Sequence, residues 1–258
     1  MRVRRSGIVL AAALSAAVSW VAGPGASLVG AATGGGECQL VGVANLSPPL
    51  SDAAGSFAYN FTGNLGTGPM GPCQSNVGAP TTGTVSAGIQ LSETVTLTCT
   101  RPGVCTNGRC DDGVTACVNS SGCPPVVTTP AGTVVYQEPI PQGSGSCGTS
   151  TTAGEALAVW NDGRNTVIDY TTTGALAAVQ LQGTVVASMT LTLVANSVPA
   201  GCTAPATFPI STDEPTLPVG DGTLALLTFS PTTQDQNCVT VGVSSANING
   251  VVGIGSAQ

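Results

Sequence analysis

Histidine and lysine are absent from the 258 residues of this chain, and charged residues of any kind make up only 7% of it. Without an imidazole, the chain cannot form a Ser-His-Asp triad, a Cys-His pair or a histidine-dependent zinc site. Aromatic residues make up 3%, so platforms that stack on sugar rings are scarce. Hydrophobic residues nevertheless make up 42%, which is enough to build a core and argues against disorder.

The first 32 residues have the form of a secretory signal peptide. Arg2, Arg4 and Arg5 make a basic start, an almost uncharged apolar run covers 8–22, and small residues follow up to Ala32. The alternative is an uncleaved membrane anchor, but the run is shorter than the roughly 20 residues that span a bilayer. We therefore expect cleavage of 1–32, secretion to the extracellular side, and no membrane span in the mature chain.

Removal of the signal leaves a strongly acidic protein. Only Arg101, Arg109 and Arg164 remain against 13 aspartates and glutamates, which gives a net charge of −10. So few cations cannot neutralise a phosphate backbone, and they cannot hold an anionic lipid surface. The sequence therefore excludes nucleic acid as a partner and predicts an extracellular or cell-wall partner of unknown identity, with no cofactor.

Alternating apolar and polar residues dominate the mature chain. Residues 57–61 and 94–100 alternate strictly, and Asp162-Gly163 marks a tight hairpin. Gly183 predicts a bulge or bend in a long strand, and 152–159 is the best candidate for a mature helix. Further predicted strands cover 133–136, 156–160, 166–170, 177–181, 185–193, 223–229, 239–243 and 247–254.

This pattern predicts an all-β fold, an antiparallel β-sandwich of the immunoglobulin-like, Greek-key or jelly-roll type. Residues 33–258 are expected to form one domain with a disulfide-rich loop inserted at about 99–130. That loop has too little apolar content to bury a core, so cross-links must hold it.

Ten cysteines in an exported chain predict five disulfides. Five of them fall within 99–123, so at least one must pair outside this segment or stay free, and Cys147 is the nearest candidate partner. The six cysteines from Cys99 to Cys147 allow fifteen pairings, which the sequence leaves open. By elimination, Cys38 is expected to pair with Cys73, and Cys202 with Cys238. The disulfide candidates are Cys38, Cys73, Cys99, Cys105, Cys110, Cys117, Cys123, Cys147, Cys202 and Cys238.

The Cys-rich loop is the predicted interaction surface. Asp111 and Asp112 offer oxygen ligands for calcium, but the spacing of an EF-hand is missing and a solvated turn is the favoured interpretation. The cysteines are spaced more widely than paired zinc ligands, which favours disulfides over a metal. Arg101 and Arg109 are basic spots that the loop could present to a partner, as protease inhibitors do. A second acidic patch, formed by Asp213, Glu214 and Asp221, is interpreted as a loop.

A pair of carboxylates could hydrolyse a glycosidic bond without histidine. Nothing in the spacing selects a pair, and Trp160 is interpreted as a core residue more readily than as a sugar platform, although it stays a binding candidate. The leading hypothesis is a non-enzymatic, exported structural or binding module; the alternatives are a carboxylate-dependent secreted hydrolase and a secreted protease inhibitor. The carboxylates on or beside predicted strands are Glu93, Glu138, Glu155, Asp162 and Asp169.

Several of these features together resemble a set of uncharacterised secreted proteins of high-GC Gram-positive bacteria. They are Cys38 in an early strand, Phe-Ala-Tyr-Asn-Phe-Thr-Gly at 57–63 before Cys73, Gly-Ser-Cys-Gly around Cys147, and Trp-Asn-Asp-Gly at 160–163. The resemblance covers most of the mature chain except the insertion at about 99–130. It implies a secreted β-sandwich and carries no activity.

Overall fold

The computed structural model describes residues 36–75 and 78–255, so the predicted signal peptide lies outside the described residues. Within these ranges the regular structure is antiparallel β-strand, apart from one short 3-10 turn, η1 (Ser120–Gly122). The prediction of an antiparallel all-β fold is therefore confirmed. No helix in the described ranges is long and apolar enough to cross a membrane.

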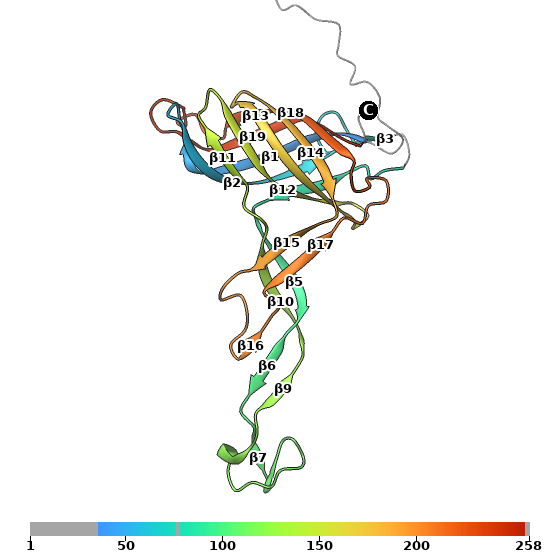
Figure 1. Ribbon diagram of the computed structural model, residues 1–258, viewed down its shortest axis with the longest axis vertical. Helices are drawn as coiled ribbons and strands as arrows, with labels where there is room; N and C mark the ends of the chain where they lie inside the picture. The colour runs from blue at the N-terminus through green and yellow to red at the C-terminus, as the bar shows by residue number, and fades with distance from the viewer. Residues whose placement is uncertain (1–35, 76–77, 256–258) are drawn as a thin grey trace, which may run out of the picture.

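Eight strands close on one another to form a barrel (Figure 1). The ring closes because β1 pairs with β19 on one side and with β2 on the other. This corrects the predicted sandwich, because one continuous sheet curls until its ends meet and leaves no exposed edge. In order around the ring the strands are β1 (Gly36–Leu50), β2 (Gly55–Leu65), β4 (Gly83–Ala87), β12 (Ser150–Trp160), β13 (Asn165–Ala175), β14 (Ala178–Val186), β18 (Gly222–Pro231) and β19 (Val243–Ile254).

Two short strands complete the barrel wall. β11 (Gln142–Gly145) pairs with β2 and β12 beyond the end of β4. The strands β4 and β11 therefore occupy one position in the ring, one after the other. β3 (Gln74–Ser75) adds to the end of β1. The chain therefore leaves the barrel after β4 and returns to the same position at β11.

Side chains fill the interior of the barrel, as expected for eight strands. Ala156, Ala158 and Trp160 point inward from β12, and Trp160 is only 3% exposed. Near the middle, the hydroxyls of Tyr59 and Tyr170 form a hydrogen bond of 2.6 Å. The barrel is therefore a packed core and not a pore.

Two excursions from the barrel form a stalk, which we define as residues 88–141 and 187–211 (Figure 1). The predicted Cys-rich insertion is the outer part of the first excursion. Next to the barrel, the stalk sheet has the order β17 (Thr207–Ser211), β15 (Ser188–Leu193), β10 (Ala131–Gln137) and β5 (Gln90–Thr96). Farther out lie β16 (Cys202–Thr203), β6 (Thr98–Arg101) and β9 (Val126–Thr128), and then β7 (Cys105–Thr106) and β8 (Arg109–Cys110).

The stalk sheet packs against the outside of the barrel. Leu157 and Val167 point outward from β12 and β13 and join a core with Val134, Met189 and Leu191 of the stalk. β12 is thus buried on both faces here, so its sequence loses strict alternation. The helix predicted at 152–159 is therefore wrong: the segment is part of β12, and its missing alternation comes from burial of both faces and not from helical structure.

Three other local predictions have different outcomes. The Asp162-Gly163 hairpin is confirmed, with Gly163 at a φ of 86° that favours glycine. The predicted bulge at Gly183 is wrong, because the ladder runs through it without a shift in register. A side chain there would come within 2.8 Å of the Asp169 carbonyl, which explains the glycine. The predicted strand at 239–243 is mostly turn, and β19 begins at Val243.

All ten cysteines form disulfides, as predicted. The pair Cys38–Cys73 is confirmed. The predicted pair of Cys202 with Cys238 is wrong, because Cys202 lies in the second excursion of the stalk, directly opposite Cys99 of the first. One cysteine of 99–123 pairs outside that segment, as predicted, but it is Cys99 with Cys202; the expected partner Cys147 is wrong, because Cys147 pairs with Cys238. The five bridges are Cys38–Cys73, Cys99–Cys202, Cys105–Cys117, Cys110–Cys123 and Cys147–Cys238.

Candidate functional site

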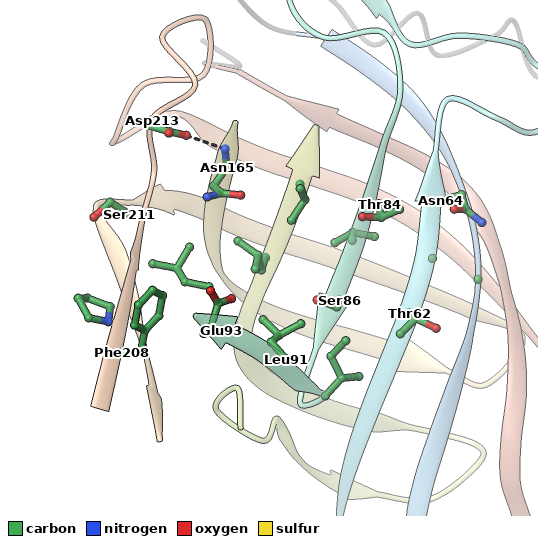
Figure 2. A pocket seen from close by; sticks show the side chains of 18 of the residues that line it. Thr62, Asn64, Thr84, Ser86, Leu91, Glu93, Asn165, Phe208, Ser211 and Asp213 are labelled. Atoms are coloured by element: carbon green, nitrogen blue, oxygen red, sulfur yellow. Dashed lines mark hydrogen bonds between the residues drawn. The ribbon is translucent and has the colours of Figure 1, made fainter. Parts of the chain in front are cut away.

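An open groove of about 860 Å³ lies where the stalk meets the barrel (Figure 2). Its floor is the outer face of β1, β2, β4 and β12, and its walls are β5 and β17 of the stalk. Sequence reasoning did not predict it, because floor and walls come from distant segments that the topology brings together.

The floor combines polar groups of β1, β2 and β4 with the apolar Leu157 and Val159 of β12. Gly42 and Gly63 lie opposite each other on β1 and β2, where a side chain on Gly42 would overlap the Thr62 carbonyl. Around this bare backbone, the side chains of Thr62, Thr84 and Ser86 line the groove. The floor therefore offers hydroxyl, backbone and apolar groups and no charge.

The walls are apolar apart from one acid. Leu91 of β5 and Phe208 and Ile210 of β17 line the groove, together with Glu93 (Figure 2). Because side chains of a strand alternate, Leu91, Glu93 and Val95 share one face of β5. A carboxylate on the apolar face of an alternating strand was the sequence signal that could have drawn attention to Glu93.

Glu93 is half-buried and has neither a hydrogen bond nor an ion pair with any of the described residues. Burial raises its pKa above the ordinary glutamate value. The pKa of Tyr136 in the stalk core is raised by burial and, in addition, by the negative charge of Glu93. The groove thus contains an acid without a partner. Its other acid, Asp213, accepts a hydrogen bond of 2.6 Å from the backbone N–H of Asn165.

The three arginines of the described residues all lie away from the groove lining. Arg101 forms an ion pair of 2.5 Å with Asp111 at the tip of the stalk. Arg109 donates to two backbone carbonyls of the tip, and Arg164 lies 3.6 Å from Glu214. No arginine is therefore available to neutralise Glu93.

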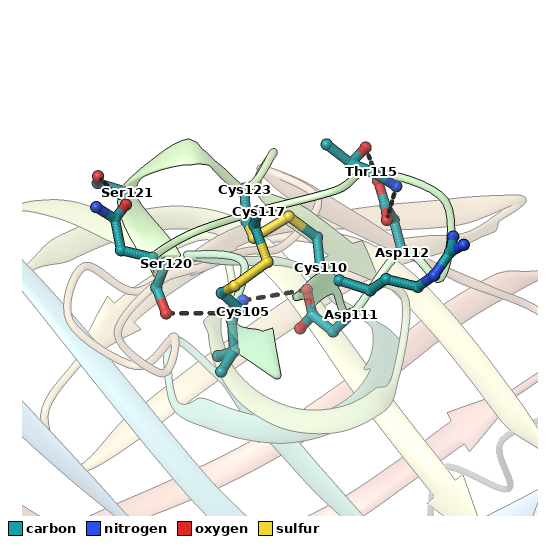
Figure 3. The surroundings of a disulfide bond; sticks show 12 residues. Cys105, Cys110, Asp111, Asp112, Thr115, Cys117, Ser120, Ser121 and Cys123 are labelled. Atoms are coloured by element: carbon teal, nitrogen blue, oxygen red, sulfur yellow. Dashed lines mark hydrogen bonds between the residues drawn. A yellow bond between two sulfur atoms is a disulfide. The ribbon is translucent and has the colours of Figure 1, made fainter. Parts of the chain in front are cut away.

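The tip of the stalk, residues 102–125, is a small disulfide-linked segment (Figure 3). Asp112 caps a turn by accepting hydrogen bonds from Thr115 and Val114, and these bonds lower its pKa. Asp111 pairs with Arg101, so both predicted calcium ligands already have protein partners. Their geometry favours the solvated-turn interpretation.

Cysteine clusters among the described residues do not offer a metal site. Cys105, Cys117 and Cys123 lie close together, and so do Asp52, Cys147 and Cys238. Every cysteine in both groups is in a disulfide, so its sulfur is not a thiolate ligand.

The other candidate carboxylates do not converge on the groove. Glu155 and Asp169 lie opposite each other on β12 and β13, and burial together with the Asp169 charge raises the pKa of Glu155. Glu138 is only 1% exposed, and Asp162 lies in the β12–β13 turn. The structure thus brings together only one predicted pair, Glu155 with Asp169, on the outer wall of the barrel.

The second acidic patch lies in a loop, as predicted, and this loop closes one end of the barrel. Glu214 is 2% exposed and accepts hydrogen bonds from the Thr216 N–H and hydroxyl. Leu217 inserts into the barrel core, and Asp221 precedes β18. Trp160 is buried in the same core, where its indole N–H donates to the Thr166 hydroxyl at 2.9 Å. These residues hold the barrel together.

Comparison of the chain with protein-family models, curated proteins and solved structures gives no match. The resemblance to secreted proteins of high-GC Gram-positive bacteria stays a prediction.

The buried carboxylates predict a dependence of stability on pH. Burial raises the pKa values of Glu93, Glu138, Glu155 and Asp221, so the folded state keeps their protons to higher pH than the unfolded state. Stability therefore falls as the pH rises from the ordinary pKa values, 4.5 for the glutamates and 3.8 for Asp221, through these raised values. Urea denaturation is expected to give a larger free energy of unfolding at about pH 5 than at about pH 7. A rise in stability over this interval would contradict the assignment.

Proposed function

We propose that this protein is an exported, non-enzymatic binding module that holds an extracellular or cell-wall ligand in the groove between barrel and stalk. The observation that carries the proposal is the groove itself: about 860 Å³, open, with hydroxyl and apolar groups on its floor, mostly apolar walls and the unpartnered Glu93. Pockets of this size with a few placed polar groups are the usual form of ligand sites.

Two features support export. The predicted signal peptide precedes the described residues, and every cysteine forms a disulfide. Disulfides persist in oxidising compartments and are rare in the reducing cytosol. The ligand is therefore expected outside the cell.

The arrangement of carboxylates favours binding over hydrolysis. A glycosidase needs two carboxyl groups that flank one bond. Glu155 and Asp169 lie outside the groove lining, and Glu138 is enclosed at the barrel–stalk junction. The other acid of the groove lining, Asp213, already accepts a hydrogen bond from the Asn165 N–H, so Glu93 has no free carboxylate as a catalytic partner in that lining.

The tip is a second candidate binding surface. Val114 and Val118 are 80% and 100% exposed on a segment whose shape two disulfides fix. Rigid, exposed apolar side chains suit contact with another protein. The protease-inhibitor alternative is less well supported, because Arg101 and Arg109 bind groups of the tip itself.

Amide chemical-shift mapping of the oxidised mature protein tests the proposal. The probes are three classes of molecule: short oligosaccharides, blocked extended peptides and alkyl amines. We expect at least one class to shift the amides of Ser86 and Glu93 in a saturable way and to be recovered unchanged. Shifts confined to Val114 and Val118 would favour the tip instead, and turnover of a probe would favour the hydrolase.

A further inference from the structure

Both walls of the groove are edge strands. The stalk sheet ends in β5 on one side and in β17 on the other, so each pairs on one side only among the described residues. An edge strand presents unpaired backbone N–H and C=O groups, which an extended chain can join. The two edges differ in how open they are.

The free edge of β5 is open. The Leu97 N–H donates to the Pro130 carbonyl at 2.8 Å, which fixes one hydrogen-bonded pair with the neighbouring chain. Such pairs recur at every second residue of an antiparallel ladder, so the backbone of Glu93 faces β10. The backbone groups of Ser92 and Thr94 then face the free edge. Their side chains are exposed on the face of β5 opposite to Leu91 and Glu93.

The free edge of β17 is blocked. The Leu193 N–H donates to the Ala206 carbonyl at 2.9 Å, and the same alternation directs the backbone of Pro209 to the free edge. Proline has no N–H to donate, and it is the residue that proteins place on edges to prevent pairing. A strand that enters the groove therefore pairs with β5.

A strand paired with β5 would place one residue directly opposite Glu93. Because Glu93 is not hydrogen-bonded toward the free edge, this would be a non-hydrogen-bonded pair, in which facing side chains lie closest. The neighbours two positions away would face Leu91 and Val95, which are apolar. The groove thus favours five consecutive ligand residues in which the first and last are apolar, the central one is basic, and the second and fourth can be of any type.

The charge at the centre of this pattern has to come from the ligand. Glu93 has no ion pair among the described residues, the chain has no lysine, and all three described arginines lie elsewhere. We propose that the groove binds an extended peptide that adds to the free edge of β5 and places a lysine or arginine side chain against Glu93. The inference rests on the proposed function, since it names the ligand class of the same groove.

Blocked peptides as long as β5 test the inference. The first has a central lysine flanked by threonines and then by valines; the second has norleucine in place of lysine. Fluorescence anisotropy is expected to show about tenfold weaker binding of the norleucine peptide, because the charge-assisted contact is lost. The variant Glu93→Gln is expected to bind both peptides alike. The matched control Asp169→Asn, outside the groove, is expected to keep the full preference for lysine.

N-methylation of the peptide tests the pairing without altering the protein. The threonine N–H groups are the ones that face β5, so their methylation is expected to abolish binding, whereas methylation at lysine is expected to leave it. Equal binding of lysine and norleucine peptides to the wild-type protein would overturn the inference. If other probes still shift the groove amides, the proposed function stands and only this ligand class fails. If no probe shifts them, both fail.

Discussion

Replacement of Cys99 and Cys202 together by alanine is expected to lower the free energy of unfolding by about 4 to 5 kcal/mol. This bridge joins the two excursions of the stalk across a sequence separation of 103 residues. Constraint of so long a loop restricts the unfolded chain strongly. Denaturation monitored by circular dichroism measures the loss, and hydrogen exchange is expected to place the new opening in β6 and β16.

The tip provides the control for this prediction. The Cys105–Cys117 bridge closes a separation of only 12 residues in a segment without a core. Its replacement by two alanines is expected to cost about 3 kcal/mol in the same chain-entropy treatment. A larger loss for the tip bridge than for Cys99–Cys202 would contradict the account of the stalk as two joined excursions.

Glu138→Ala is expected to lower the free energy of unfolding by about 2 to 4 kcal/mol. Glu138 is only 1% exposed and accepts hydrogen bonds from the Ser86 hydroxyl at 2.7 Å and the Ile89 N–H at 3.1 Å. These donors are half-buried where the chain leaves the barrel, and alanine would leave both without this acceptor. Urea denaturation at about pH 7 measures the effect.

The amide analogue separates hydrogen bonding from charge. Glu138→Gln keeps an acceptor for the Ile89 N–H and removes a buried carboxylate that has no cationic partner among the described residues. It is expected to cost less than about 1 kcal/mol and to flatten the fall in stability with rising pH. Equal losses for the alanine and glutamine variants would show that the charge, and not the hydrogen bonds, matters at this junction.

Local structure could be predicted from the sequence better than topology. The alternation and the Asp162-Gly163 turn were sufficient for the strands and the hairpin, because both depend on neighbouring residues. Closure into a barrel depends on β1 pairing with β19, at opposite ends of the described chain, which no local pattern reveals. The wrong prediction of a Cys202–Cys238 bridge has the same cause. Pairing the leftover cysteines by their order in the chain does not take into account which excursions lie side by side in the stalk.

The candidate site was predicted only in part. Glu93 was among the carboxylates considered, but the groove around it depends on β2 and β17 being brought beside β5. The exposed tip was predicted from its cysteines, whereas the engagement of Arg101 with Asp111 was not. Trp160 could be assigned to the core because tryptophan in proteins is more often a core residue than a sugar platform, and its burial agrees with that interpretation.

The central claim is that the groove, and not the tip, holds the ligand. The chemical-shift titration tests it most directly, because Ser86 and Glu93 report on the groove and Val114 and Val118 report on the tip in one experiment. The account predicts saturable shifts at the groove amides with the tip amides unchanged. Saturable shifts at the tip alone would contradict it.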